Sequence, residues 1–291
     1  MRIGRKIIVG TVFGAASSAA SFMANQKLGT AELLFRCAQQ MGLSPVWITP
    51  LGVFAIIIDG RERYINLARS PLNSAASVSL ARNKYITRRI LERHHMQNIP
   101  FTLPHTQLEA ETFLNYHGTI IAKPITGAGA RDIHIITEPA QLTALQIDLY
   151  LLEKYITGKE LRYLLLNSEV VGVHRSEYGT SVAEDRPLQR ISYPRAIWDS
   201  ALLKSSLRIA DIFNLRFAAV DYLIDSSGRA YILEVNTMPG LKWFHAPSNG
   251  PIVDIARLFL ESMVDMLRSE RQFIRGSVTS NHIRTYSRLA G

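Results

Sequence analysis

The sequence predicts a mixed α/β fold in which antiparallel hairpins outnumber clean βαβ units. Asp59-Gly60 makes a two-residue turn between the alternating apolar runs of "IIIDGRERYINL", which is typical of a hairpin. A second turn, "SSG", joins the apolar strands "FAAVDYLID" and "AYILEVNT". Apolar residues recur at helical spacing in "AELLFRCAQQMGL" and "PIVDIARLFLESMVDMLRSE", so helices accompany these strands.

The composition is that of an ordinary folded protein. The chain has 291 residues, of which 47% are hydrophobic and 20% charged, enough for one to three subdomains. Its single cysteine, Cys37, excludes an intrachain disulfide and any multi-cysteine metal site. The net charge of +9 favours an anionic partner, but an arginine-rich C-terminal stretch carries part of it, which is weak support for nucleic-acid binding.

The first 80 residues are predicted to form a small α/β domain. Its first 25 residues have two interpretations, a signal peptide or a first strand "KIIVGTVF", and we favour the strand because Gly10, Gly14 and several serines interrupt the apolar run. A helix over 28–41, a strand "PVWIT" and the Asp59-Gly60 hairpin follow. No other stretch approaches the ~20 apolar residues of a membrane span, so we expect a cytoplasmic protein without membrane contact.

The remaining elements follow in order. We expect a helix over 83–98, β-rich segments up to residue 178, a polar loop over 179–192 and a helix over 199–213. The "SSG" hairpin and a last amphipathic helix come next, and a mobile basic tail ends the chain. The predicted boundaries are 1–80, 81–157, 158–273 and 274–291.

Asp221, Glu234 and Asn236 are predicted to meet at one end of the "SSG" hairpin. Glu234 and Asn236 lie two positions apart and share one strand face, with Asp221 on the neighbouring strand. Carboxylates buried without a cation are costly, and oxygen ligands without histidine or cysteine suit Mg²⁺. The alternative is that each carboxylate bonds a buried backbone group, but three such residues in register favour a metal site.

Two further segments have the chemistry of a nucleotide site. In "AKPITGAGARDI", Lys123 precedes a loop of Gly127, Ala128 and Gly129, whose small residues let backbone N–H groups approach phosphate. The loop is neither a Walker A nor a Rossmann motif, and a plain turn is the alternative. In "LLEKYITGKEL", Glu153 and Glu160 flank a turn whose backbone edge can pair with adenine, or both are surface residues of a hairpin.

The order of five motifs resembles the ATP-grasp superfamily of carboxylate–amine ligases: "NK" at 83–84, "AKPITGAGA", "LLEKYITGKEL", "VDYLID" and "ILEVNTMPGL". "EVNTMPGL" and "EKYITGKE" are similar to D-alanine–D-alanine ligases, whereas "GAGARDIHII", "GVHRSE" and "NGPIVDIARLFLE" resemble RimK-type glutamate ligases. "SVSLARNKYITRRIL" resembles glutathione synthetase fusions and cyanophycin synthetases. Over residues 78–270, the resemblance implies an ATP-grasp fold with two subdomains, 81–157 and 158–273, that clamp ATP.

The resemblance also implies roles for matching positions. Lys84 and Lys123 are expected to contact the ATP phosphates, with the 127–130 loop folding over them. Glu153 is expected to take the adenine amino group, and Glu160 the ribose. The backbone of Lys154 and Ile156 would meet the adenine ring edge. Two Mg²⁺ ions, for which Mn²⁺ can substitute, would be held by the side chains of Asp221, Glu234 and Asn236.

Arginines are expected beside the phosphoryl group, because charge develops on its oxygens during transfer. Arg175 follows "VVGVH" as in RimK-type ligases, and Arg190 lies in the predicted polar loop; a surface salt bridge is the alternative for both. Ala219 stands where D-alanine–D-alanine ligases have an arginine, so we do not assign that specific activity. Lys242 and His245, which follow the last motif, are candidates for a different acceptor pocket.

We therefore expect an ATP- and Mg²⁺-dependent ligase that joins a carboxylate to an amine through an acylphosphate. Its partners would be small-molecule or peptide substrates, and a homo-oligomer is compatible with the sequence. The alternatives are a kinase-like phosphoryl transferase of the same fold and a non-catalytic protein that binds a nucleotide or nucleic acid. The sequence names neither the carboxylate nor the amine.

Overall fold

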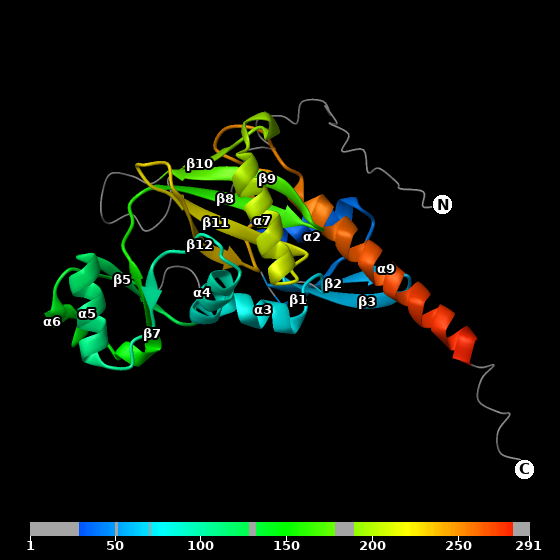
Figure 1. Ribbon diagram of the computed structural model, residues 1–291. Helices are drawn as coiled ribbons and strands as arrows, with labels where there is room; N and C mark the ends of the chain where they lie inside the picture. Colours follow the sequence, from blue (N-terminus) through cyan, green and yellow to red (C-terminus); the bar gives the residue numbers. More distant parts are fainter. Residues whose placement is uncertain (1–28, 50–51, 70, 128–131, 178–188, 282–291) are drawn as a thin grey trace, which may run out of the picture.

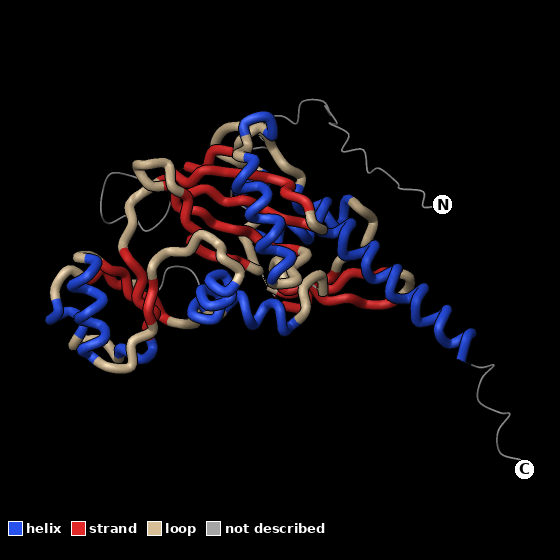
Figure 2. Tube along the Cα trace, in the orientation of Figure 1, coloured by secondary structure: helices blue, strands red, loops and turns tan. Residues whose placement is uncertain are grey.

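The computed structural model describes residues 29–49, 52–69, 71–127, 132–177 and 189–281. The N-terminal segment with its two interpretations, the loop residues Ala128 and Gly129, and the last ten residues of the expected tail lie outside these ranges. The described chain has three sheets of three, five and four strands, and the strands within each sheet pair antiparallel, as predicted (Figure 2).

The N-terminal elements form a helix and a three-stranded sheet. Asp59 and Gly60 have positive φ angles of 49° and 75°, which confirms the predicted tight turn. Phe35, Trp47 and Phe54 stack together between the helix and the sheet. The bounds are α2 Thr30–Gln40, β1 Val46–Thr49, β2 Val53–Ile58 and β3 Arg61–Asn66.

The next elements build a small four-stranded sheet with the order β4-β7-β5-β6. Its helix α5 covers one face through a cluster that includes Leu114, Ala122 and Leu152. The helix expected over residues 83–98 is α4. Asn83 lies between α3 and α4 and caps α4 by accepting a hydrogen bond from the Ile86 N–H. The bounds are α3 Ala75–Arg82, α4 Lys84–Arg93, β4 Phe101–Thr102, α5 Gln107–His117, β5 Ile120–Pro124, β6 His134–Ile136, α6 Pro139–Leu142 and β7 Tyr150–Lys154.

A five-stranded sheet has the order β10-β9-β8-β11-β12. Helix α7 lies across one of its faces (Figure 1). Arg190 was expected in a loop but lies in strand β10, because residues 189–192 extend the sheet by pairing with β9. The bounds are β8 Lys159–Leu166, β9 Glu169–Glu177, β10 Gln189–Ser192, α7 Ser200–Ile212, β11 Phe217–Ile224, β12 Ala230–Asn236, α8 Lys242–His245 and α9 Ile255–Asn281.

The second face of the five-stranded sheet is apolar at one end only. There Leu164, Leu166 and Phe217 share a core with α9 and with Leu34 and Phe54 of the N-terminal elements. The N-terminal elements therefore pack into the same core as the five-stranded sheet. At the other end this face is polar, and that end carries the candidate site.

Helix α9 is longer than expected. It continues to Asn281, so residues 274–281 are helical although the sequence was interpreted as a tail from residue 274. This stretch contains no proline, and a helix already anchored in the core can continue into it. None of the helices in the described ranges has the length and apolar content needed to cross a membrane.

Candidate active site

Five polar side chains form one row across the five-stranded sheet. Strand pairing places Glu234 opposite Asp221, and Asp221 opposite Arg162 on its other side. Arg162 is in turn opposite His174, and His174 is opposite Ser192. Directly opposed residues project to the same face of a sheet. The structure therefore brings five side chains into one polar row, in the strand order β12-β11-β8-β9-β10.

A second set of side chains lies beside this row. Glu160, Ser176 and Arg190 are opposite one another on β8, β9 and β10, two positions along each strand from the row. Because the side-chain period of a strand is two, they project to the same face as the row. The predicted ribose residue and one predicted arginine thus share a face with the predicted metal residues.

Arg162 and Asp221 form a tight, buried ion pair at the centre of the row. The guanidinium donates from Nε to Oδ1 and from Nη2 to Oδ2, both at 2.6 Å. Burial alone would lower the pKa of Arg162, but the Asp221 carboxylate raises it above its usual value. Both oxygens of one predicted metal ligand therefore have a cationic partner within the chain.

Glu234 is the carboxylate of the row that carries excess negative potential. Loss of water raises its pKa, the neighbouring Asp221 raises it further, and Arg162, Lys84 and Lys123 oppose this. Among the described residues no three His, Cys, Asp or Glu side chains cluster as a metal site, so the donor set is two carboxylates and the Asn236 amide. Hard oxygen donors with an uncompensated carboxylate fit Mg²⁺, which takes few protein ligands and completes its shell with phosphate oxygens and water.

A buried charge cluster connects the four-stranded sheet to strand β12 of the five-stranded sheet. Glu153 of β7 accepts hydrogen bonds of 2.6 Å from Arg88 Nε and from Lys123 Nζ. Arg88 also donates to the backbone carbonyls of Ile232 (2.6 Å) and Leu233 (3.0 Å) in β12. One guanidinium thus joins the four-stranded sheet to the strand that carries Glu234.

Glu153 is almost fully buried in this cluster. Its relative exposure is 1%, and both carboxylate oxygens have partners. Burial alone would raise the pKa of Glu153, but Arg88 and Lys123 lower it to about 2, so the group is ionised at neutral pH. In the structure this carboxylate orients Lys123, a contact that the sequence does not reveal.

Lys84, the first residue of α4, lies beside the Gly127 loop. Its backbone N–H donates to the Ile125 carbonyl at 2.9 Å, and its Nζ donates to the Gly127 carbonyl at 3.2 Å. Burial lowers the pKa of Lys84, Glu234 opposes this lowering, and Lys123 adds to it. The two predicted phosphate lysines and Glu234 therefore interact electrostatically.

The structure does not bring Arg175 to the row. Its neighbours across the sheet are Leu161 and Ile191, so its side chain projects to the α7 face, where it forms a salt bridge with Glu177. Adjacent strand residues alternate in direction, which places Arg175 opposite to His174. The row contains instead Arg162, on a strand that follows the "EKYITG" segment.

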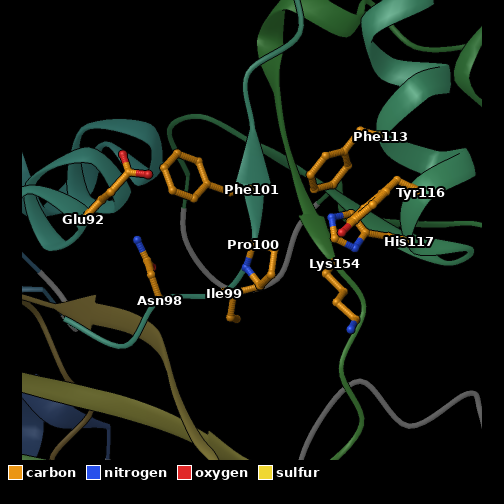
Figure 3. Close-up of a pocket in the computed structure, with 9 residues that line it drawn as sticks. All are labelled: Glu92, Asn98, Ile99, Pro100, Phe101, Phe113, Tyr116, His117 and Lys154. Carbon is orange, nitrogen blue, oxygen red and sulfur yellow. The ribbon is translucent and has the colours of Figure 1, made fainter. Parts of the chain in front are cut away.

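Lys154 and Ile156, the predicted adenine-edge residues, lie at the end of β7 and in the segment after it. A cavity of about 780 Å³ lies beside Lys154 (Figure 3). Phe113, Tyr116 and His117 of α5 cluster on one side of it, next to Pro100. Its lining contains no member of the polar row, so we define the candidate site by the row and not by this cavity.

Several residues in and beside the row are absent from the sequence predictions, among them Arg88, Arg162, His174 and Ser192. Arg162 had a recognisable signal, because it lies two positions from Glu160 and therefore on the same strand face. Arg88 lies one helical turn after Lys84, which also places the two on one side of α4. His174 had no signal, since its burial depends on strands and a helix distant in sequence.

Comparison with known proteins agrees with this geometry. Residues 81–176 match the model of the ATP-grasp domain family, a segment that runs from the end of α3 to strand β9. Over these residues the chain is similar to an ATP-grasp domain. The match includes Lys84, Lys123 and Glu153, whereas Asp221 and Glu234 lie C-terminal to it.

Curated relatives extend the similarity beyond the ATP-grasp domain. The D-alanine–D-alanine ligase of Trichlorobacter lovleyi is 24% identical over 185 residues, which are 57% of this chain and 53% of the relative. A probable alpha-L-glutamate ligase of Rhodopirellula baltica is 24% identical over 243 residues, 75% of this chain and 58% of the relative. The chain therefore spans a little over half the length of these relatives.

Solved structures share the fold at low sequence identity. The macrocyclase MdnC of Microcystis aeruginosa, bound to the precursor peptide MdnA, aligns with a TM-score of 0.59 and 12% identity, over 81% of this chain and 96% of MdnC. A bifunctional glutathione synthetase of Pasteurella multocida aligns with a TM-score of 0.59 and 11% identity, over 84% of this chain and 44% of that enzyme. The ATP-grasp fold therefore extends beyond the family match.

Proposed function

We propose that this chain is an ATP- and Mg²⁺-dependent ligase that joins a carboxylate to an amine and releases ADP and phosphate. The polar row supports this proposal: Glu234 and Asp221 are directly opposed on β12 and β11, and Asn236 follows two positions later on the same face. Lys84 and Lys123 lie within electrostatic range of Glu234. Acidic metal ligands beside lysines are what a metal–triphosphate complex needs.

The reaction would proceed in two balanced steps. A carboxylate oxygen of the first substrate attacks the γ-phosphorus of ATP, the bond from that phosphorus to the bridging oxygen breaks, and ADP leaves. An amine nitrogen then attacks the acyl carbon of the acylphosphate, phosphate leaves, and the nitrogen loses a proton. Positioning and charge neutralisation supply most of the rate in such a transfer.

We propose a separate role for each group of residues in and beside the row. Lys84 and Lys123 would neutralise the phosphates, and Glu153 would hold Lys123 in place through its 2.6 Å contact. Asp221, Glu234 and Asn236 would hold two Mg²⁺ ions, or Mn²⁺ in their place, and bound metal would neutralise charge on the transferred phosphoryl group. Arg162 and Arg190 would approach the reacting centre from the far side of the metal ligands, as their strand positions allow.

Small molecules and peptides are both candidates for the substrates. The relatives carry the names of D-alanine–D-alanine ligase and probable alpha-L-glutamate ligase, and MdnC was solved with a precursor peptide. For this chain we propose an amino acid or peptide as the carboxylate substrate and a cytoplasmic location, where ATP is available. Ala219 and the segment after Gly240 differ from D-alanine–D-alanine ligases, so we do not propose that activity.

A screen for ADP release tests the proposal. The full chain would be incubated with Mg²⁺, ATP and pairs drawn from amino acids, dipeptides and small acids. Hydroxylamine would be added to active mixtures as a surrogate amine, because it converts an acylphosphate into a stable hydroxamate. A hydroxamate that depends on ATP and on one acid supports ligation. ADP release together with a phosphorylated substrate, and no hydroxamate with any acid, would favour a kinase-like transferase.

A further inference from the structure

The two halves of the polar row differ in charge. The first half, on β11 and β12, is acidic because it contains Asp221 and Glu234. The second half, on β9 and β10, contains His174 and Ser192, and Arg190 lies beside them. His174 is fully buried, and its Nε2 lies 3.4 Å from Arg190 Nη1. Burial lowers the pKa of His174 far below its usual value, and Arg162 and Arg190 lower it further, so a neutral imidazole can accept this hydrogen bond.

Helix α8 covers this second half. The chain leaves β12 at Asn236, turns at Pro239-Gly240 and packs α8 against β9 and β10. The Phe244 ring lies 4.5 Å from the His174 imidazole, measured between centroids. Gly172 permits this approach, because a Cβ at that position would lie 2.7 Å from the Phe244 ring. The residues after the "EVNTMPGL" motif therefore lie over the basic end of the row.

Helix α8 places a second cation beside Arg190. Arg190 Cζ lies 5.8 Å from the centroid of the Trp243 ring, and Lys242 Nζ lies 4.7 Å from the same ring. Lys242, Trp243 and Arg190 are all partly exposed, so a ligand can reach them. The Ser248 N–H donates to the Arg190 carbonyl at 2.9 Å, and the Arg190 N–H donates to the Ser248 Oγ at 3.1 Å, so β10 is fixed against the segment after α8.

We propose that Arg190, Trp243 and Lys242, which we call the anion clamp, bind the carboxylate of the amino acid or peptide substrate. This inference rests on the proposed ligase function and names the substrate subsite within it. His174 is a positioning residue of the clamp. It contacts Arg190 through its Nε2 and Phe244 through its ring face, and so it touches both elements that supply the cations.

The strand order separates the anion clamp from the metal ligands. Neighbouring strands lie about 4.8 Å apart, and β10 is three strands from β11, so these two strands lie about 14 Å apart in the sheet. Arg162 lies between them and is paired with Asp221. A carboxylate on the clamp would thus lie on the same face as the phosphates, on the side away from the metal ligands, which is where the acid substrate is needed. Two cations on one indole ring favour an anion over a metal ion.

Calorimetric titration of the full chain tests the clamp directly. The probes are L-alanine, L-glutamate and L-alanyl-L-glutamate, with L-alaninamide as a probe without a carboxylate, each added with and without MgADP. We expect at least one acid to bind the wild type more tightly than the amide does. Arg190→Gln and Lys242→Gln should each weaken the binding of that acid by about tenfold or more, because each removes a charge-assisted contact.

The chain offers a matched control. Arg195 Cζ lies 5.8 Å from the Trp198 ring, the same distance as in the Arg190–Trp243 pair, but outside the row. Arg195→Gln should leave acid binding unchanged, and all three variants should bind MgADP like the wild type. Equal acid affinity in the wild type, Arg190→Gln and Lys242→Gln would overturn the clamp. So would a wild type that binds none of the acids, or a clamp variant that loses MgADP affinity and keeps acid affinity.

His174 is tested by two substitutions. In His174→Gln the side-chain oxygen can still accept from Arg190, whereas His174→Leu removes the acceptor. We expect His174→Leu to weaken acid binding by about tenfold and His174→Gln to stay within about threefold of the wild type. Thermal melting reports folding separately. If both variants change only the melting temperature, the positioning role is wrong.

The clamp and the ligase proposal can fail independently. If the wild type binds an acid through the clamp but forms no hydroxamate with any acid, the ligase proposal fails and the clamp stands. If hydroxamate forms and the KM for the acid is the same in Arg190→Gln and Lys242→Gln, the clamp fails and the ligase stands. An unchanged KM for ATP in these variants supports the carboxylate as the bound anion.

Discussion

Arg162 and Asp221 lie directly opposite each other on neighbouring strands, and the guanidinium binds both oxygens of the carboxylate at 2.6 Å. One residue of the predicted metal triad is therefore neutralised by the chain itself. Among the described residues no arginine binds both oxygens of Glu234, on the next strand, and the pKa of Glu234 is raised by loss of water and by Asp221. A divalent ion would relieve the Glu234 carboxylate and compete with Arg162 for Asp221.

A double-mutant cycle measures the Arg162–Asp221 pair. Arg162→Met should lower the free energy of unfolding by about 3–5 kcal/mol, because it leaves a buried carboxylate without its cation. Asp221→Asn should have a cost of similar sign, and the double variant should lose less than the sum of the two. Denaturant titration of the four proteins gives the coupling. Additive losses would show that the ion pair contributes no pairwise stabilisation.

Glu234→Ala should abolish ATP turnover and leave the protein folded. The substitution removes the carboxylate that lacks a partner and also removes its repulsion of Asp221, so the melting temperature should stay the same or rise. The exposed Glu169, at the start of β9, is the control, and Glu169→Ala should retain turnover. The two readouts are ADP release at saturating Mg²⁺ and thermal melting. Normal turnover in Glu234→Ala would contradict the assignment of Glu234 as a metal ligand.

The Glu153 cluster makes stability depend on acid pH. The pKa of Glu153 is about 2 in the folded chain, below its ordinary value of 4.5, so the unfolded state binds the proton more readily. This stabilisation, about 3 kcal/mol, is complete above pH 4.5 and is lost as the pH falls towards 2. Unfolding measured from pH 7 to pH 3 should show the loss. In Glu153→Gln the overall stability should be lower and this acid-dependent part absent.

Arg88→Lys should loosen strand β12. A lysine can keep a charge near Glu153, but it cannot bind Glu153 and the Ile232 and Leu233 carbonyls together in the fork geometry of a guanidinium. Hydrogen exchange of residues 230–236 should become faster, and the KM for ATP should rise. Arg89→Lys, at an exposed position that pairs with Glu92, is the matched control. Equal exchange in both variants would show that Arg88 does not hold β12.

Local sequence patterns were sufficient for the "SSG" hairpin. Glu234 and Asn236 share a strand face, and the turn pairs that strand with the strand of Asp221, as predicted. A register shift between Asp221 and Tyr222 then brings Glu234, and not Leu233, opposite Asp221. The Asp59-Gly60 hairpin and helix α7 follow from the same kind of local signal. The turn determines which strands pair, whereas the bulge determines which residues lie opposite each other.

The rest of the site depends on partners that are distant in the sequence. Strand β8 lies between β9 and β11 in the sheet, so Arg162 meets Asp221 across 59 residues of sequence. Arg88 reaches Glu153 and the backbone of β12 through tertiary packing of α4. Arg175 was assigned from a motif, and the alternation of strand β9 directs it to the α7 face. Such relations need the strand order, which local periodicity does not contain.

The shared core of the N-terminal elements and the five-stranded sheet has a consequence for inheritance. Leu34 and Phe54 cover the same apolar surface as Leu164 and Phe217, although the family match begins only at residue 81. A chain started at that boundary would expose this surface to water and would tend to aggregate. The unit that folds, and that evolution can move as a whole, is therefore larger than the segment that the family model matches.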